Sequence, residues 1–177
     1  MKEDIRMKTI TITLIALFAI ISLQNTALAA TSEITWTDYD KYRDIYPSNN
    51  ESRKFFRERT FKNFEKYFAK LAESLPEGQV LKIEVTDVDL AGDARFSGGI
   101  HRLRIVKDIY FPRMKFSYQL VNADGNEVVS AEVELKDMNF MFAIGRTLKY
   151  RNDSLGYEKK MLDEWFKETF KDQIVKT

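Results

Sequence analysis

The sequence predicts an α+β fold, a two-layer sandwich in which two amphipathic helices cover one face of a mainly antiparallel sheet of about four strands. Two segments, around residues 56–75 and 157–170, repeat apolar residues with the period of a helix. Segments between them alternate apolar and polar residues with the period of a strand. Since consecutive strands of this kind pair antiparallel with one face in water, we expect both helices on the other face.

A short strand and a long helix open the domain. Residues 34–36 alternate apolar and polar side chains, and residues 48–50 are of the types that cap helix N-termini. Pro76 and Gly78 end the periodic segment that follows. Its apolar stripe consists of Phe56, Phe64, Tyr67, Phe68, Leu71 and Leu75. We therefore expect an amphipathic helix of roughly six turns.

The strands and the second helix follow. Alternation starts at Val80, a further strand is expected over residues 102–110, and two alternating runs, 114–120 and 129–135, flank an Asp-Gly turn. Two such runs around an Asp-Gly turn predict a β-hairpin. Residues 137–151 have no regular period and are expected to form an irregular loop. The second helix carries Tyr157, Met161, Leu162, Trp165, Phe166 and Phe170 on one face.

Residues 1–29 have the pattern of a cleavable signal peptide. Lys8 precedes an apolar run over residues 10–23, which is short for a membrane span, and Ala27-Leu28-Ala29 supplies small residues before a cut after Ala29. Met7 is expected to be the initiator, because starting there removes Glu3 and Asp4 from the positive region. We therefore expect residues 30–177 to form a single exported domain, periplasmic rather than fully secreted, with no stable membrane anchor after cleavage.

Composition excludes several classes of function. The chain has no Cys, which excludes a lipid-attachment site, disulfides and thiolate metal sites. Of its 28 Lys and Arg and 27 Asp and Glu, three basic and two acidic residues precede Ala30, so the remainder has no net charge. A general nucleic-acid binder needs a basic excess, so nucleic acid is not an expected partner. His101 is the only His, which argues against a His-based metal site or a Ser-His-Asp triad.

Several segments resemble a known family in the right order along the chain. They are residues 42–45 (YRDI), 50–53 (NESR), 75–79 (LPEGQ), 86–92 (TDVDLAG), 111–114 (FPRM), 135–138 (LKDM) and 157–159 (YEK). In these segments the chain is similar to the bacterial family called domain of unknown function 3016. The resemblance implies an exported envelope protein of Gram-negative bacteria, and it implies no established activity, cofactor or catalytic residue.

The candidate polar site is Asp87, Asp89, Arg113 and Asp137. Asp87 and Asp89 are two residues apart on a predicted strand, so their carboxylates project to one face and could bind Ca²⁺ or Mg²⁺ or act as acid and base. The alternative is a structural role near the turn at Gly92. Asp87 continues the apolar face of Val85, so either it enters the core edge with a partner, such as Arg113, or a bulge changes the register.

The candidate interaction loop is the apolar group Met138, Phe140, Met141, Phe142 and Ile144. These side chains either fold back onto the core or form a surface for a partner. The leading hypothesis is a non-enzymatic periplasmic module that binds an envelope protein, peptide or other envelope component, because no catalytic motif is present. The alternatives are a small metal- or carboxylate-dependent hydrolase using Asp87, Asp89 and Asp137, and an accessory subunit of an envelope complex. The sequence indicates no particular cofactor or metal.

Overall fold

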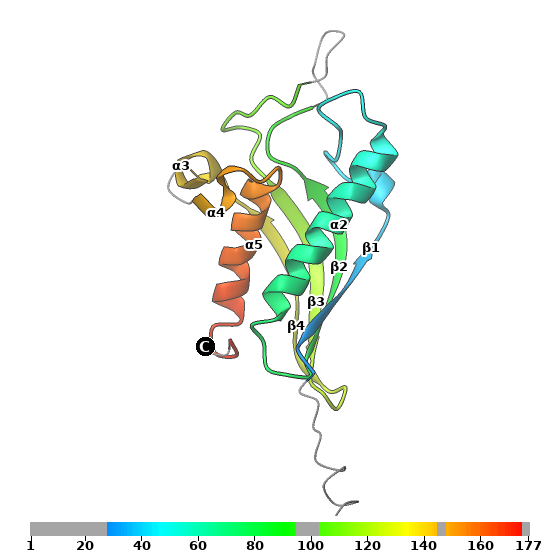
Figure 1. The fold of residues 1–177 in the computed structure, drawn as a ribbon, viewed down its shortest axis with the longest axis vertical. Coiled ribbons are helices and arrows are strands. Elements are labelled where there is room, and N and C mark those ends of the chain that lie inside the picture. The colour runs from blue at the N-terminus through cyan, green and yellow to red at the C-terminus, as the bar shows by residue number, and fades with distance from the viewer. Residues whose placement is uncertain (1–27, 95–102, 145–147, 175–177) are drawn as a thin grey trace, which may run out of the picture.

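The computed structural model describes residues 28–94, 103–144 and 148–174 (Figure 1). His101 and all but the last two residues of the predicted signal peptide lie outside these ranges. The strands are β1 (Thr31–Trp36), β2 (Val80–Asp89), β3 (Arg113–Val121) and β4 (Glu127–Lys136). The helices are α2 (Arg53–Ala72), α3 (Phe140–Ile144), α4 (Leu148–Arg151) and α5 (Gly156–Thr169), and residues Tyr39–Lys41 form a short 3₁₀ turn.

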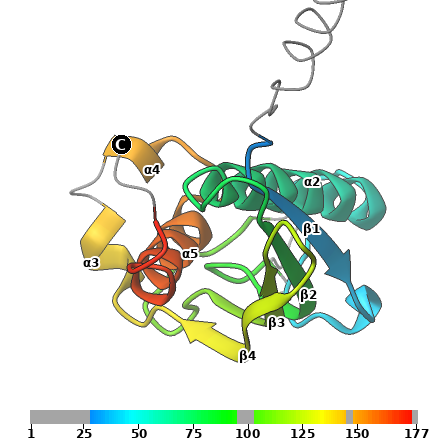
Figure 2. The ribbon, with the colours of Figure 1, turned by 90° about the horizontal axis from the view of Figure 1, so that it is seen from below.

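The four strands form one sheet in the order β1-β2-β3-β4. The chain crosses over through α2, so β1 pairs in parallel with β2, and the other neighbours are antiparallel. The long helices α2 and α5 lie on the same face of the sheet, as Figures 1 and 2 show from two directions. The predicted α+β sandwich with two helices on one face is therefore confirmed.

The predicted hairpin is present as β3 and β4. Phe116 lies opposite Val133 and Tyr118 opposite Ala131, so the apolar residues of both strands share the helix side of the sheet. Gly125 in the connecting turn has φ of +81°, a left-handed conformation that glycine adopts without steric cost. The other face of the sheet, which carries the alternating polar residues, has no helix on it in the described structure (Figure 2).

Aromatic contacts join the two layers. On the α2 side, the Trp36 ring of β1 stacks on Phe61 with centroids 3.9 Å apart. On the α5 side, the Trp165 ring packs edge-on against Phe116 at 4.8 Å and against Tyr118 at 5.5 Å, both from β3. The core therefore fills the space between the sheet and the two helices.

Three predictions about local structure were wrong. Residues 103–110 form no strand, because Ile105 makes only an isolated bridge to Asp93. Residues 137–151 are not an irregular loop, since they contain α3 and α4, helices too short to show a period in the sequence. Helix α2 is capped by the Ser52 side chain, which accepts a hydrogen bond from the Phe55 N–H at 3.3 Å, and not by residues 48–50.

Within the described ranges, no helix has the length and hydropathy needed to cross a membrane.

Candidate functional site

Asp87 and Asp89 lie at the end of β2, where a bulge shifts the register between Val85 and Asp87. The bulge turns both carboxylates to the polar face, one of the two arrangements that the sequence left open. Asp87 Oδ1 accepts a hydrogen bond from the Arg43 N–H at 2.9 Å. Arg113 lies against Asp89 and not against Asp87, with Nη1 3.9 Å from Asp89 Oδ2. The Arg43 guanidinium approaches the same oxygen at 3.7 Å, so Asp89 lies between two cations.

The partly buried Asp89 carboxyl has an altered pKa. Burial raises the pKa of the Asp89 carboxyl to about 6, against the opposing attraction of Arg113 and Arg43. A carboxyl with such a pKa carries charge at neutral pH and loses it in mildly acidic solution. Its chemistry allows proton exchange near pH 6, and its position among arginines also suits a purely structural role.

We predict a midpoint near pH 6 when the Asp89 carboxyl carbon is titrated by NMR. Because the pKa is raised above that of the unfolded chain, the contribution of Asp89 to stability is present below about pH 4 and is lost as pH rises through about 6. Asp89→Asn should remove this part of the pH dependence of unfolding. Arg113→Gln should move the midpoint higher, since Arg113 favours the charged form, and a midpoint near 4 would contradict the account.

Asp137 is not brought to the other two carboxylates. It turns toward α5 on the helix side, where Lys160 Nζ lies 3.2 Å from Asp137 Oδ2. Asp89, opposite Arg113, is on the polar side of the sheet. Across residues 28–94, 103–144 and 148–174, no three acidic or His side chains are placed to hold a metal ion together.

A buried ionic cluster at the same end of the sheet has no counterpart in the sequence predictions. Arg104 Nη1 pairs with Asp44 Oδ2 at 3.0 Å, and Asp44 is almost completely buried. The same guanidinium donates to the carbonyls of Gly92 at 3.1 Å and Tyr46 at 2.9 Å. The alternating sequence around Arg104 predicts a strand in contact with solvent. Nothing in the sequence therefore predicts this buried ionic cluster.

Glu158, in the first turn of α5, completes the cluster. Its Oε1 accepts a hydrogen bond from the Ala91 N–H at 2.7 Å, which ties α5 to the chain leaving β2. Burial raises the pKa of the Glu158 carboxyl, while the Ala91 N–H and the Arg104 charge act in the opposite direction. Arg104 and Glu158 also line a cavity of about 340 Å³ between α2 and the start of α5. The contacts of this cluster are all internal and hold the end of the sheet in shape.

The predicted interaction loop is divided by the structure. Phe140 is fully buried and packs edge-on against Tyr157 with centroids 4.8 Å apart. By contrast, Phe142 is 81% exposed and Met138 is 60% exposed, and Met141 is also exposed. The Ile144 side chain lies outside the described part of the structure. One aromatic ring therefore anchors α3 to the domain while its neighbours face solvent.

A second exposed apolar segment joins the sheet at the same corner. Residues 103–109 precede β3 and residues 138–142 follow β4. Between each segment and its strand lie Pro112 and Asp137, and the Asp137 N–H donates a hydrogen bond to the Pro112 carbonyl at 3.2 Å. Both lie toward the end of the molecule where α5 begins (Figure 1). Together they hold most of the exposed large apolar side chains of the described residues, here called the apolar end: Leu103, Ile105, Val106, Ile109, Met138, Met141 and Phe142.

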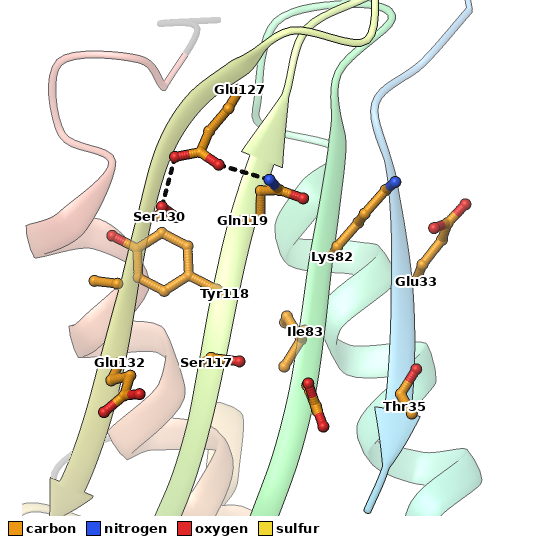
Figure 3. A pocket seen from close by; sticks show the side chains of 12 residues that line it. Glu33, Thr35, Lys82, Ile83, Ser117, Tyr118, Gln119, Glu127, Ser130 and Glu132 are labelled. Atoms are coloured by element: carbon orange, nitrogen blue, oxygen red, sulfur yellow. Dashed lines mark hydrogen bonds between the residues drawn. The ribbon is translucent and has the colours of Figure 1, made fainter.

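The polar face of the sheet forms a shallow hollow of about 540 Å³ across all four strands (Figure 3). Its acidic side chains outnumber the single lysine, Lys82. Glu127 of β4 accepts hydrogen bonds from Gln119 Nε2 and Ser130 Oγ, each at 2.6 Å, and these bonds lower the pKa of the Glu127 carboxyl. The hollow is open, so it suits an extended macromolecular contact better than enclosure of a small substrate.

The comparisons with known proteins agree with the resemblance seen in the sequence. No curated protein and no solved structure matches the chain. The model of the family described as "Protein of unknown function (DUF3016)" matches residues 30–168, which include every helix and strand of the sandwich except the last residue of α5. The chain therefore belongs to the DUF3016 family, whose description assigns no function.

Proposed function

We propose that this chain is an exported, non-enzymatic module of the bacterial envelope that binds a protein partner through the apolar end. The observation that carries the proposal is the exposure of Met138, Met141 and Phe142, which follow β4, together with that of the segment 103–109, which precedes β3. Soluble domains rarely leave large apolar side chains grouped in this way unless the surface is used for binding. Methionine side chains are flexible and polarizable, which suits a surface that adapts to another protein.

The arrangement of the ionisable groups supports binding over catalysis. Asp137 is paired with Lys160, Asp44 with Arg104, and Asp89 lies between two arginines. A hydrolase using Asp87, Asp89 and Asp137 would need the three carboxylates in one cleft. The sheet separates Asp137 from the other two, so this alternative has no support from the geometry.

The position of the first strand agrees with the proposed export. Cleavage after Ala29 would remove Leu28, which is exposed, and would leave Ala30, which is buried, at the start of the domain. Strand β1 begins at Thr31 and would stay whole. We expect the protein in the periplasmic fraction with Ala30 as its first residue. Retention of residues 1–29 on the mature protein, or recovery in the cytoplasm, would contradict the proposal.

The docking surface is tested by replacing Met138, Met141 and Phe142 with Ser in one variant. Because these side chains are exposed, we expect the free energy of unfolding to change little, within roughly 0.5 kcal/mol per site. We expect a protein cross-linked to the wild type in intact cells to be captured at least tenfold less by the variant. Phe55→Ser is the matched control, since Phe55 is 65% exposed on α2.

The same pair of variants separates a protein partner from a lipid surface. Equal capture by the wild type and the triple variant would contradict the proposed site. Binding of the purified wild type to vesicles of anionic phospholipid, lost in the triple variant, would contradict a protein partner and assign the apolar end to the membrane surface.

A further inference from the structure

Strand β4 is one of the two edge strands of the sheet, and its free edge is long. It spans Glu127–Lys136, ten residues, and it pairs with β3 on one side only. In the described part of the chain, no strand or loop makes a backbone hydrogen bond to the other side of β4 between residues 128 and 135. Figure 2 shows β4 at the margin of the sheet, away from α2. A row of unpaired N–H and C=O groups is a template for another strand.

Apart from its charged side chains, this edge lacks the features that usually prevent strand pairing. Natural edge strands are shortened, or carry Pro, charged side chains (Lys above all), a central bulge or inward-pointing charges. Strand β4 has no Pro, and the irregularity in its pairing with β3 lies at the turn, between Leu120 and Val121. Its only Lys is the last residue, Lys136. The edge is therefore structurally open to an added strand.

The helix side of β4 is incompletely covered. Val129, Val133 and Leu135 are partly buried, whereas Phe116 and Leu120, their neighbours on β3, are almost completely buried. Ala131, between them, is exposed. An added strand that placed apolar side chains on this face would extend the core and remove this surface from water.

The polar side of β4 is acidic. Glu127, Glu132 and Glu134 all lie on this strand, and the one basic residue of the described neighbourhood that pairs with them is Lys115, 3.2 Å from Glu134. In Figure 3 the Glu132 carboxylate stands at the margin of the hollow, on the edge strand β4. Side chains directly opposite one another on neighbouring strands are about 4.5–5.5 Å apart at Cβ, so residues of an added strand would meet these glutamates.

We infer that β4 binds an extended segment of another protein by β-strand addition, and that this segment alternates basic residues, facing the glutamates, with apolar residues on the helix side. Main-chain hydrogen bonds would supply affinity, and the alternating pattern would supply specificity. Two copies of this chain paired antiparallel about Glu132 or Val133 would place glutamates directly opposite one another, so these two registers of a dimer are disfavoured. The inference goes beyond the proposed function and concerns a different surface from the apolar end.

The test uses a fluorescein-labelled octapeptide, Lys-Val-Lys-Thr-Lys-Val-Lys-Thr, titrated with the mature protein. We expect saturable binding with slower hydrogen exchange of the β4 amides. The same peptide with Glu for every Lys should bind at least tenfold more weakly. Glu132→Lys should weaken binding of the Lys peptide by about fivefold, the effect of an exposed ion pair. The matched control is Glu84→Lys on β2, an acidic residue of the same face away from the edge, which should change binding less than twofold.

Two N-methylated peptides separate strand addition from simple charge attraction. In an added peptide strand, the N–H groups of odd and even residues point to opposite edges of the peptide, and only one edge pairs with β4. Methylation at odd positions and methylation at even positions therefore remove the N–H groups of different edges. We expect one of the two peptides to lose binding and the other to keep it. Equal binding by both, no binding of the Lys peptide, or a dimer of the chain that Glu132→Lys abolishes would each overturn the inference. The triple variant of the apolar end should bind the peptide as the wild type does, so the two proposals fail independently.

Discussion

Replacing Arg104 with Met is expected to lower the free energy of unfolding by about 3–5 kcal/mol, the cost of leaving a buried charge without its partner. Asp44, which pairs with Arg104 at 3.0 Å, is only 1% exposed. The Arg104 guanidinium also satisfies the carbonyls of Tyr46 and Gly92, which Met cannot do. Chemical denaturation at neutral pH measures this change directly.

A surface arginine provides the matched control for Arg104. Arg59 pairs with Glu51 at 2.6 Å but its side chain is 58% exposed, so Arg59→Met should cost at most about 1 kcal/mol. The double variant Arg104→Met with Asp44→Asn should be more stable than Arg104→Met alone, because the unpaired charge is removed. Equal effects at Arg104 and Arg59 would show that the buried cluster does not hold the end of the sheet. Since Arg104 also anchors the segment 103–109, its loss should weaken binding through the apolar end.

Replacing Phe68 with Ala is expected to lower the free energy of unfolding by about 3–5 kcal/mol, through lost burial and an unfilled cavity. Phe68 is fully buried where α2 crosses the sheet, with its ring 6.3 Å from that of Phe116 on β3. Phe55 is on the same helix but 65% exposed, and Phe55→Ala should change stability by less than about 0.5 kcal/mol. Comparable losses in the two variants would contradict the placement of the helix faces.

The layer architecture could be predicted because burial imposes periods on the sequence. The alternation of residues 114–120 and 129–135 specifies which face of β3 and β4 is buried, and the Asp-Gly turn joins them. The aromatic stripe of α2 specifies its buried face in the same way. The parallel pairing of β1 with β2 was beyond this reasoning, because alternation shows a strand's faces and not its neighbour or direction.

The candidate site was less predictable because its contacts join residues far apart in sequence. The conflict with the face of Val85 left two arrangements open for Asp87, of which the structure has the bulge. The contacts of Arg43 with both Asp87 and Asp89 were not predicted. The pairing of Asp137 with Lys160 depends on where α5 packs, so the sequence around either residue does not predict it. The split of the apolar loop, with Phe140 buried and Phe142 exposed, depends on the short helix α3.

The central claim is that the apolar end contacts a protein partner in the cell envelope, and site-specific photocrosslinking tests it most directly. A photoreactive amino acid is placed at Phe142, or at Phe55 as the exposed aromatic control on α2, and intact cells are irradiated. The account predicts a discrete adduct to one protein from position 142 and none from position 55. Adducts of the same pattern and yield at both positions, or no protein adduct from position 142, would contradict it.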